Sequence, residues 1–220
     1  MFTPNTPDRP PQTPNEWGIL VVLSFFFALF LALDLVQDFE IAKISVPSFL
    51  LAWVLLLGLH ELGHALAARA LGWRVEEICI GTGKVRGRGR WFGMPVEFRT
   101  LPLSGYVRPR PRNLRAPRLK HFIIFAAGPG IELLAVAGIA ALVGPERLLG
   151  VSESWTMIAV QSFCIAAVLG AVLNLIPLPH RSPEGDAWSD GLGMILCWRV
   201  SDEEYRKMRD GNGPEPPQES

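Results

Sequence analysis

Long apolar stretches alternate with polar segments along this chain. Four of the apolar stretches approach the roughly 20 residues that cross a bilayer, and they cover residues 17–36, 47–72, 121–144 and 155–179. The segment 73–120 is too polar to span, and the alternation in Val96–Thr100 is typical of a β-strand. The pattern predicts an α-helical polytopic membrane protein with about four transmembrane helices. We expect a small membrane-associated β-hairpin or sheet, of two or three short strands, between the second and third helices.

Polar segments at both ends frame one predicted membrane-embedded core. Residues 1–16 are rich in proline, which is typical of a disordered tail. Residues 201–220 are polar and mostly acidic, and we expect them to form a second tail. Residues 17–200 between these tails make up the predicted core.

The formal net charge of zero conceals an uneven distribution of charge. Segment 73–120 holds twelve Lys and Arg residues against three Glu. By the positive-inside rule this basic loop faces the cytoplasm, and four spans put both termini on the same side. Such a loop also suits anionic lipid headgroups, so we expect the lipid bilayer rather than nucleic acid as its partner. The prediction is a multi-pass integral membrane protein, in the cell membrane if the source is prokaryotic.

The second predicted span carries the pattern His60-Glu61-Leu62-Gly63-His64. Residues four apart lie on one face of a helix, so both imidazoles can bind one zinc ion. The glutamate between them can act as a general base toward water. At about 1.5 Å per residue, the two histidines lie roughly 12 to 18 Å from the expected end of the helix at Gly72. The metal would therefore be sunk in the membrane, toward the cytoplasmic face.

Two histidines four apart can also be ordinary core residues. The chain has only four histidines, however, and two of them fall in this spacing around a glutamate. Ionisable groups inside a membrane span are costly and usually functional, which favours a metal site. A catalytic zinc typically takes three protein ligands, so a third must come from elsewhere in the chain. No motif links the three cysteines, so they indicate neither zinc ligands nor a disulfide framework. They are Cys79, Cys164 and Cys197.

The chain resembles the site-2 protease family, the intramembrane zinc metalloproteases, through several motifs in the same order over residues 47–198. Besides the histidine motif these are Ile80–Gly83, Leu101–Val107, Ala127–Pro129, and Asn174–Pro177 followed by Asp190-Gly191. The resemblance implies a helix bundle around one buried zinc ion per chain. The ligands that it implies are His60, His64 and Asp190.

The resemblance also implies roles for other residues. Glu61 would activate water, and Asn174 would hydrogen-bond the substrate backbone or the developing oxyanion. The basic loop 73–120 resembles the membrane-associated β-hairpin of the family, which can hold an unwound substrate by strand addition.

Two departures from the family pattern leave alternatives open. A polar insert, 180–189, precedes Asp190 and contains Asp186, a rival third ligand, and His180, a further candidate. We prefer Asp190 because a glycine and an apolar segment follow it, as in the family. Glu132 stands where the family tends to have asparagine. It is either a hydrogen-bonded glutamate between helices or a part of the site.

These observations predict an intramembrane zinc metalloendopeptidase. It would hydrolyse a peptide bond within or near the transmembrane segment of a membrane protein, as in regulated intramembrane proteolysis. The expected partner is a transmembrane or membrane-anchored protein substrate. The alternative is a non-catalytic zinc-binding membrane scaffold of the same fold, but zinc binding alone does not need Glu61. A soluble zinc peptidase is disfavoured by the other apolar spans.

Overall fold

The computed structural model describes residue 29 and residues 40–182 and 185–211. The tail 1–16 and almost all of the first predicted span, 17–36, lie outside the described residues. The chain divides into two units, 1–43 and 44–220, and the packing discussed below is that of the second. In the described part, three helices are long and apolar enough to cross a membrane: Ile41–Ala70, Pro117–Val143 and Trp155–Leu175. They confirm the prediction of a helical membrane protein.

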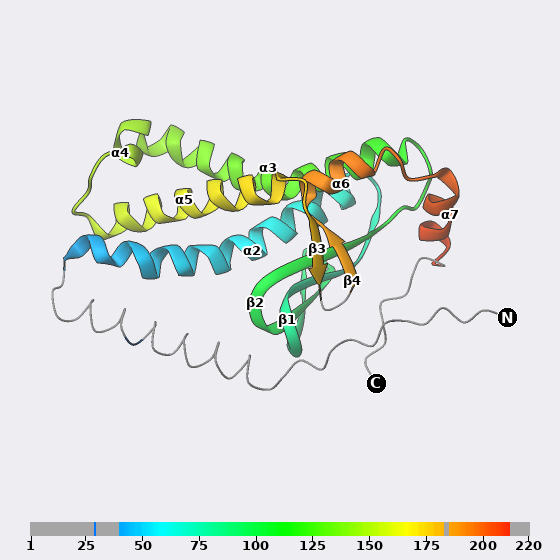
Figure 1. The fold of residues 1–220 in the computed structure, drawn as a ribbon, viewed down its shortest axis with the longest axis horizontal. Helices are drawn as coiled ribbons and strands as arrows, with labels where there is room; N and C mark the ends of the chain where they lie inside the picture. Colours follow the sequence, from blue (N-terminus) through cyan, green and yellow to red (C-terminus); the bar gives the residue numbers. More distant parts are fainter. Residues whose placement is uncertain (1–28, 30–39, 183–184, 212–220) are drawn as a thin grey trace. The chain divides into compact units, whose positions relative to one another are not determined.

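The second unit is built on three helices that pack against one another (Figure 1): α2 (Ser45–Ala70), α3 (Pro117–Val143) and α5 (Trp155–Leu175). Two short helices flank them, η1 (Ile41–Ile44) before α2 and α4 (Pro145–Leu149) between α3 and α5. Small residues allow close approach, since a Cβ on Gly63 of α2 would lie 2.5 Å from the Ala127 carbonyl oxygen of α3. Leu50, Leu51 and Leu55 on α2 are exposed, as expected of side chains that face lipid.

Glycine and proline set the helix ends. α2 stops just before Gly72, whose φ of +78° is typical of the residue that follows a helix, and this agrees with the sequence prediction. α5 ends at Leu175, earlier than predicted. The reason is that Pro177 lacks an N–H and restricts Ile176 to an extended conformation. α3 begins earlier than predicted, at Pro117, because proline suits the first helical turn.

A long antiparallel hairpin connects α2 to α3, between the second and third predicted spans as expected. Its strands are β1 (Arg74–Trp91) and β2 (Met94–Arg110). Phe92 and Gly93 between them both have positive φ, which is typical of a two-residue turn between twisted strands. The prediction of short strands is wrong, because most glycines of this segment lie within the strands.

The hairpin bends back on itself. Residues 78–80 of β1 each pair with two separate parts of β2. Gly81 and Gly83, with φ of +99° and +85°, allow the backbone to turn at this point. The bent hairpin packs on α2, where the Arg69 guanidinium donates to the Phe92 carbonyl. The β-structure therefore lies beside the helix that carries the histidine motif.

The C-terminal part has more regular structure than the sequence predicted. The polar insert contains a small hairpin, β3 (Pro179–Ser182) and β4 (Gly185–Trp188), and α6 (Asp190–Leu196) follows it. The expected acidic tail begins with α7 (Asp202–Asp210), which is capped by reciprocal hydrogen bonds between Ser201 and Glu204. Tyr205 of α7 is fully buried, and Arg118 of α3 forms a 2.7 Å ion pair with Asp202. α7 is thereby docked on the core.

Candidate metal centre

One face of α2 turns toward the other helices and carries the polar residues of the motif. His60, Glu61 and His64 are only 6%, 4% and 6% exposed, although they lie in an apolar helix. They share this face with small and apolar residues: Ala52, Leu56, Gly63, Ala65 and Ala68. Because residues four apart lie on one face, the two imidazoles emerge from successive turns toward the same point.

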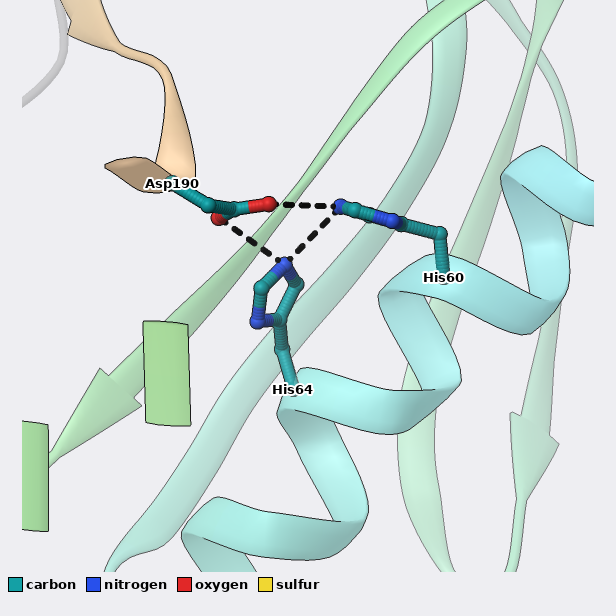
Figure 2. A group of neighbouring side chains, drawn as sticks. All are labelled: His60, His64 and Asp190. Carbon is teal, nitrogen blue, oxygen red and sulfur yellow. Dashed lines mark hydrogen bonds and ion pairs between the residues drawn. The ribbon is translucent and has the colours of Figure 1, made fainter. Parts of the chain in front are cut away.

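Asp190 of α6 meets the two imidazoles at that point (Figure 2). The Nε2 atoms of His60 and His64 lie 3.1 Å apart. Oδ2 of Asp190 lies 3.0 Å from Nε2 of His60, and Oδ1 lies 3.2 Å from Nε2 of His64. Each residue thus offers one ligand atom to a common centre, and all three side chains are buried. We call these three residues the triad.

The triad fits a zinc ion. Zinc binds imidazole nitrogen and carboxylate oxygen at about 2.0–2.2 Å, which puts neighbouring atoms of a tetrahedral site about 3.3–3.6 Å apart. The 3.1 Å between the two Nε2 atoms is within a few tenths of an ångström of that spacing. Each carboxylate oxygen of Asp190 lies at a similar distance from one of these nitrogens, Oδ2 at 3.0 Å from His60 and Oδ1 at 3.2 Å from His64. Gly128 of α3 faces the same point, and a side chain there would overlap the His64 imidazole. The converging lone pairs and the space left by glycine are what a cation with three protein ligands requires.

The far side of each ring also has a partner on α3. Nδ1 of His64 donates to the carbonyl oxygen of Ile124 at 2.6 Å. Nδ1 of His60 lies 3.4 Å from Oε2 of Glu132, a glutamate that is 3% exposed. With the protons on Nδ1, both rings present Nε2 lone pairs to the centre.

Asp190 is positioned by the packing of α6 against the ends of two longer helices. A Cβ on Gly191 would lie 1.9 Å from the carbonyl oxygen of Leu175, so α6 rests directly on the last residue of α5. A Cβ on Gly193 would lie 2.5 Å from the ring of Phe125 on α3. Two glycines therefore bring the start of α6 close enough for its aspartate to reach α2.

The charge of Asp190 suits a metal ligand. An aspartate carboxyl is ordinarily ionised near neutral pH, and the carboxylate is the form that binds a cation.

The other predicted site residues lie outside the triad. The Glu61 carboxylate lies against β2, where a Cβ on Gly105 would be 2.7 Å from Oε1. Asn174 is half-buried in the last turn of α5, beside the junction with α6. The side chains of residues 180–187 lie outside the described part of the chain, and they include Asp186 and His180.

Sequence reasoning missed the contributions of Gly128, Gly105 and Ile124. A signal for the two glycines was present, since both lie in motifs that carry the family resemblance. Ile124 contributes only its carbonyl oxygen. A backbone atom is common to every residue type, so no sequence pattern could have revealed it.

Comparisons with known proteins agree with this geometry. Residues 48–146 match the model of Peptidase family M50. Cj1068 of Campylobacter jejuni, whose name includes the words zinc metalloprotease, is 36% identical over 119 residues, which are 47% of this chain and 30% of that protein. Protease RseP of Yersinia pestis is 36% identical over 80 residues, 35% of this chain and 18% of that protein. Regulator of sigma-E protease RseP of Escherichia coli is 34% identical over 99 residues, 39% of this chain and 22% of that protein.

The matched relatives are much longer proteins, and the chain spans less than a third of their length, at 30%, 18% and 22%. The segment that matches the family model, residues 48–146, carries most of α2, the β1–β2 hairpin and α3. The resemblance inferred from the sequence motifs is confirmed: residues 48–146 of this chain match peptidase family M50, the site-2 protease family, and the chain is similar to proteins named as zinc metalloproteases and RseP proteases.

Proposed function

We propose that this chain is an intramembrane zinc metalloendopeptidase with His60, His64 and Asp190 as the ligands of one zinc ion. The observation that carries the proposal is the buried convergence of the triad among helices long enough to cross a membrane. The similarity to proteins named as proteases supports the same activity.

The chemistry is assigned to the residues around the triad. Zinc, when bound, would polarise a peptide carbonyl and increase the acidity of water. Glu61 follows His60 directly in α2, so its carboxylate is the proposed base that takes the proton of the attacking water and passes it to the leaving amine. Asn174 is proposed to donate a hydrogen bond to the substrate backbone or to the carbonyl oxygen as it gains charge. Its half-buried position at the α5–α6 junction supports this role.

The substrate class follows from where the triad lies. A peptide bond must reach a centre that is buried among apolar helices, so the proposed substrate is a transmembrane or membrane-anchored protein that is cleaved in or near its span. A helical peptide bond is shielded by its hydrogen bonds, so this segment must unwind before cleavage. The β1–β2 hairpin packs on α2, and its strand edges offer backbone groups that can hold an extended chain at the membrane surface.

The proposed topology puts both termini and the basic segment 73–120 in the cytoplasm. Twelve Lys and Arg residues against three Glu in that segment support this orientation. Residues 17–200 would form the membrane-embedded core, with residues 17–36 as a further span. The triad would then open toward the cytoplasmic half of the bilayer.

Co-reconstitution of enzyme and substrate tests the activity. The full chain is purified in detergent, loaded with zinc, and reconstituted in liposomes with a panel of tagged single-span membrane proteins that lack their large extramembrane domains. We expect the wild type to release fragments whose new ends, identified by mass spectrometry, lie in or near the span. Glu61→Gln keeps the size of the side chain, so it should retain zinc and cleave at least about 100-fold more slowly.

Two outcomes would contradict the proposal. Equal cleavage by the wild type and by Glu61→Gln would show that this glutamate is not the base. Stoichiometric zinc without cleavage of any panel member would support the scaffold function instead.

A further inference from the structure

Glu132 places a carboxyl group in the apolar interior between helices. It lies on α3 and is 3% exposed, so it lacks the hydration that usually stabilises a carboxyl group. Oε2 of Glu132 makes no hydrogen bond within the described residues, and neither does Nδ1 of His60. These two buried polar atoms face each other at 3.4 Å. Each is therefore the natural partner of the other, and a small rotation of either side chain would close the hydrogen bond.

The geometry of the triad fixes which nitrogen of His60 must carry a proton. Its Nε2 lies 3.0 Å from Asp190 and 3.1 Å from Nε2 of His64, so this is the atom that faces a metal. A metal-binding nitrogen offers a lone pair, and in a neutral imidazole the proton then sits on the other nitrogen, Nδ1. That proton points at Glu132. His64 shows the same arrangement, with the Ile124 carbonyl as the acceptor.

The two histidines nevertheless have acceptors of different strength. The acceptor for His64 is a neutral backbone carbonyl, whereas the acceptor for His60 is a carboxyl group, which binds an N–H more strongly when it is ionised. A hydrogen bond from a ligating imidazole to a carboxylate orients the ring and makes the ligating nitrogen a better electron donor. Gly170 of α5 lies beside this carboxyl, since a Cβ there would be in ordinary contact with its Oε1 at 3.6 Å.

We infer that Glu132 is a positioning residue for the metal centre, because it accepts the Nδ1 proton of His60 and holds that ring with Nε2 toward the triad. This inference rests on the proposed zinc site and deepens it by assigning an outer partner to each histidine. In this role Glu132 acts through His60 and is not itself a metal ligand. Its effect is on how tightly the metal is held and in what geometry.

Zinc affinity tests the inference without any need for a substrate. The full chain is purified in detergent, stripped of metal, and titrated with Zn²⁺ in competition with a chromophoric chelator. Glu132→Leu removes the acceptor at similar volume, and we expect a 10- to 100-fold weaker affinity, as is usual when the outer partner of a metal ligand is lost. Glu132→Gln keeps an oxygen that can accept the proton, so it should lose less than Glu132→Leu. Ser162→Ala is the matched control, because Ser162 is also buried but hydrogen-bonds the Ser45 carbonyl in another part of the bundle.

A second readout separates positioning from general packing. The visible absorption of bound Co²⁺ depends on the arrangement of the ligands, so it should change in Glu132→Leu and remain as in the wild type in Ser162→Ala. Zinc affinity of Glu132→Leu within twofold of the wild type, or equal losses in Glu132→Leu and Ser162→Ala, would overturn the inference and leave the proposed function intact. Failure of the wild type to bind Zn²⁺ at all would overturn both.

Discussion

The backbone of Gly128 lies directly against the His64 imidazole. A Cβ at position 128 would be 2.3 Å from Nε2 of His64 and 2.7 Å from Nε2 of His60. These are the two nitrogen atoms that converge with Asp190, so a methyl group would clash with both imidazoles at their metal-facing atoms. The glycine at this position of α3 is thus required by the space between the ligands rather than by the conformation of the helix.

Gly128→Ala should abolish zinc binding. The added methyl cannot be accommodated unless the imidazoles leave the positions from which they reach a common ion, so we expect less than a tenth of the wild-type zinc content. The measurement is metal analysis of the purified chain after dialysis against zinc. Gly130→Ala on the same helix is the control, because a Cβ there has no neighbour within 4 Å and alanine favours a helix by about 1 kcal/mol over glycine. Normal zinc content in Gly128→Ala would contradict the proposed centre.

Asp190→Ala should weaken zinc binding by more than about 100-fold. The loss of a direct ligand should lower the zinc affinity more than the loss of a residue that only hydrogen-bonds a ligand. Asp186→Ala provides the comparison, since Asp186 is the rival third ligand in the polar insert before Asp190. Metal content and chelator competition measure both variants beside the wild type. The reverse pattern, with zinc lost only in Asp186→Ala, would move the third ligand into the β3–β4 hairpin.

Gly105→Ala should impair cleavage while zinc remains bound. The new methyl would lie 2.7 Å from Oε1 of Glu61 and 2.8 Å from the Cys79 carbonyl oxygen, so it would displace the carboxylate. A displacement of about 1 Å in a catalytic group can cost on the order of 100-fold in rate. The rate is measured with a substrate that the wild type cleaves, and Gly89→Ala on β1 is the control because a Cβ there meets no atom within 4 Å. An unchanged rate with Gly105→Ala would argue against Glu61 as the base.

Tyr205→Ala should detach α7 from the core. The ring is fully buried and its hydroxyl donates to the Cys197 carbonyl at 3.3 Å, so its removal should cost about 3–5 kcal/mol. A helix of this length is not stable alone, and its amide exchange should therefore rise by about two orders of magnitude or more. Hydrogen–deuterium exchange of residues 202–210 measures the effect. Tyr205→Phe should cost only about 1 kcal/mol, and the exposed Arg206→Ala should change nothing. Unchanged exchange in Tyr205→Ala would show that α7 is held by other contacts.

Local patterns predicted the parts of the fold that depend on neighbouring residues. The sequence predicted the long apolar helices α2, α3 and α5, because a membrane span needs about 20 apolar residues in a row. The sequence did not predict the turn at Phe92-Gly93 or the long strands on either side of it, because glycine ordinarily weakens a strand, and β1 contains several glycines. α7 was missed, although Ser201 and Glu204 carry the spacing of a capping box.

By itself, the sequence determined that His60 and His64 share one helical face inside an apolar helix, because helix geometry links residues four apart whatever surrounds them. The physical reason why an acid from a distant segment comes to them lies in the tertiary structure. Asp190 reaches the pair because Gly191 lets α6 rest on the end of α5 and Gly193 lets it approach α3. The same packing brings Ile124 and Glu132 behind the two rings and Gly128 between them. Distances between segments far apart in the chain depend on how helices pack, and no local spacing rule contains that information.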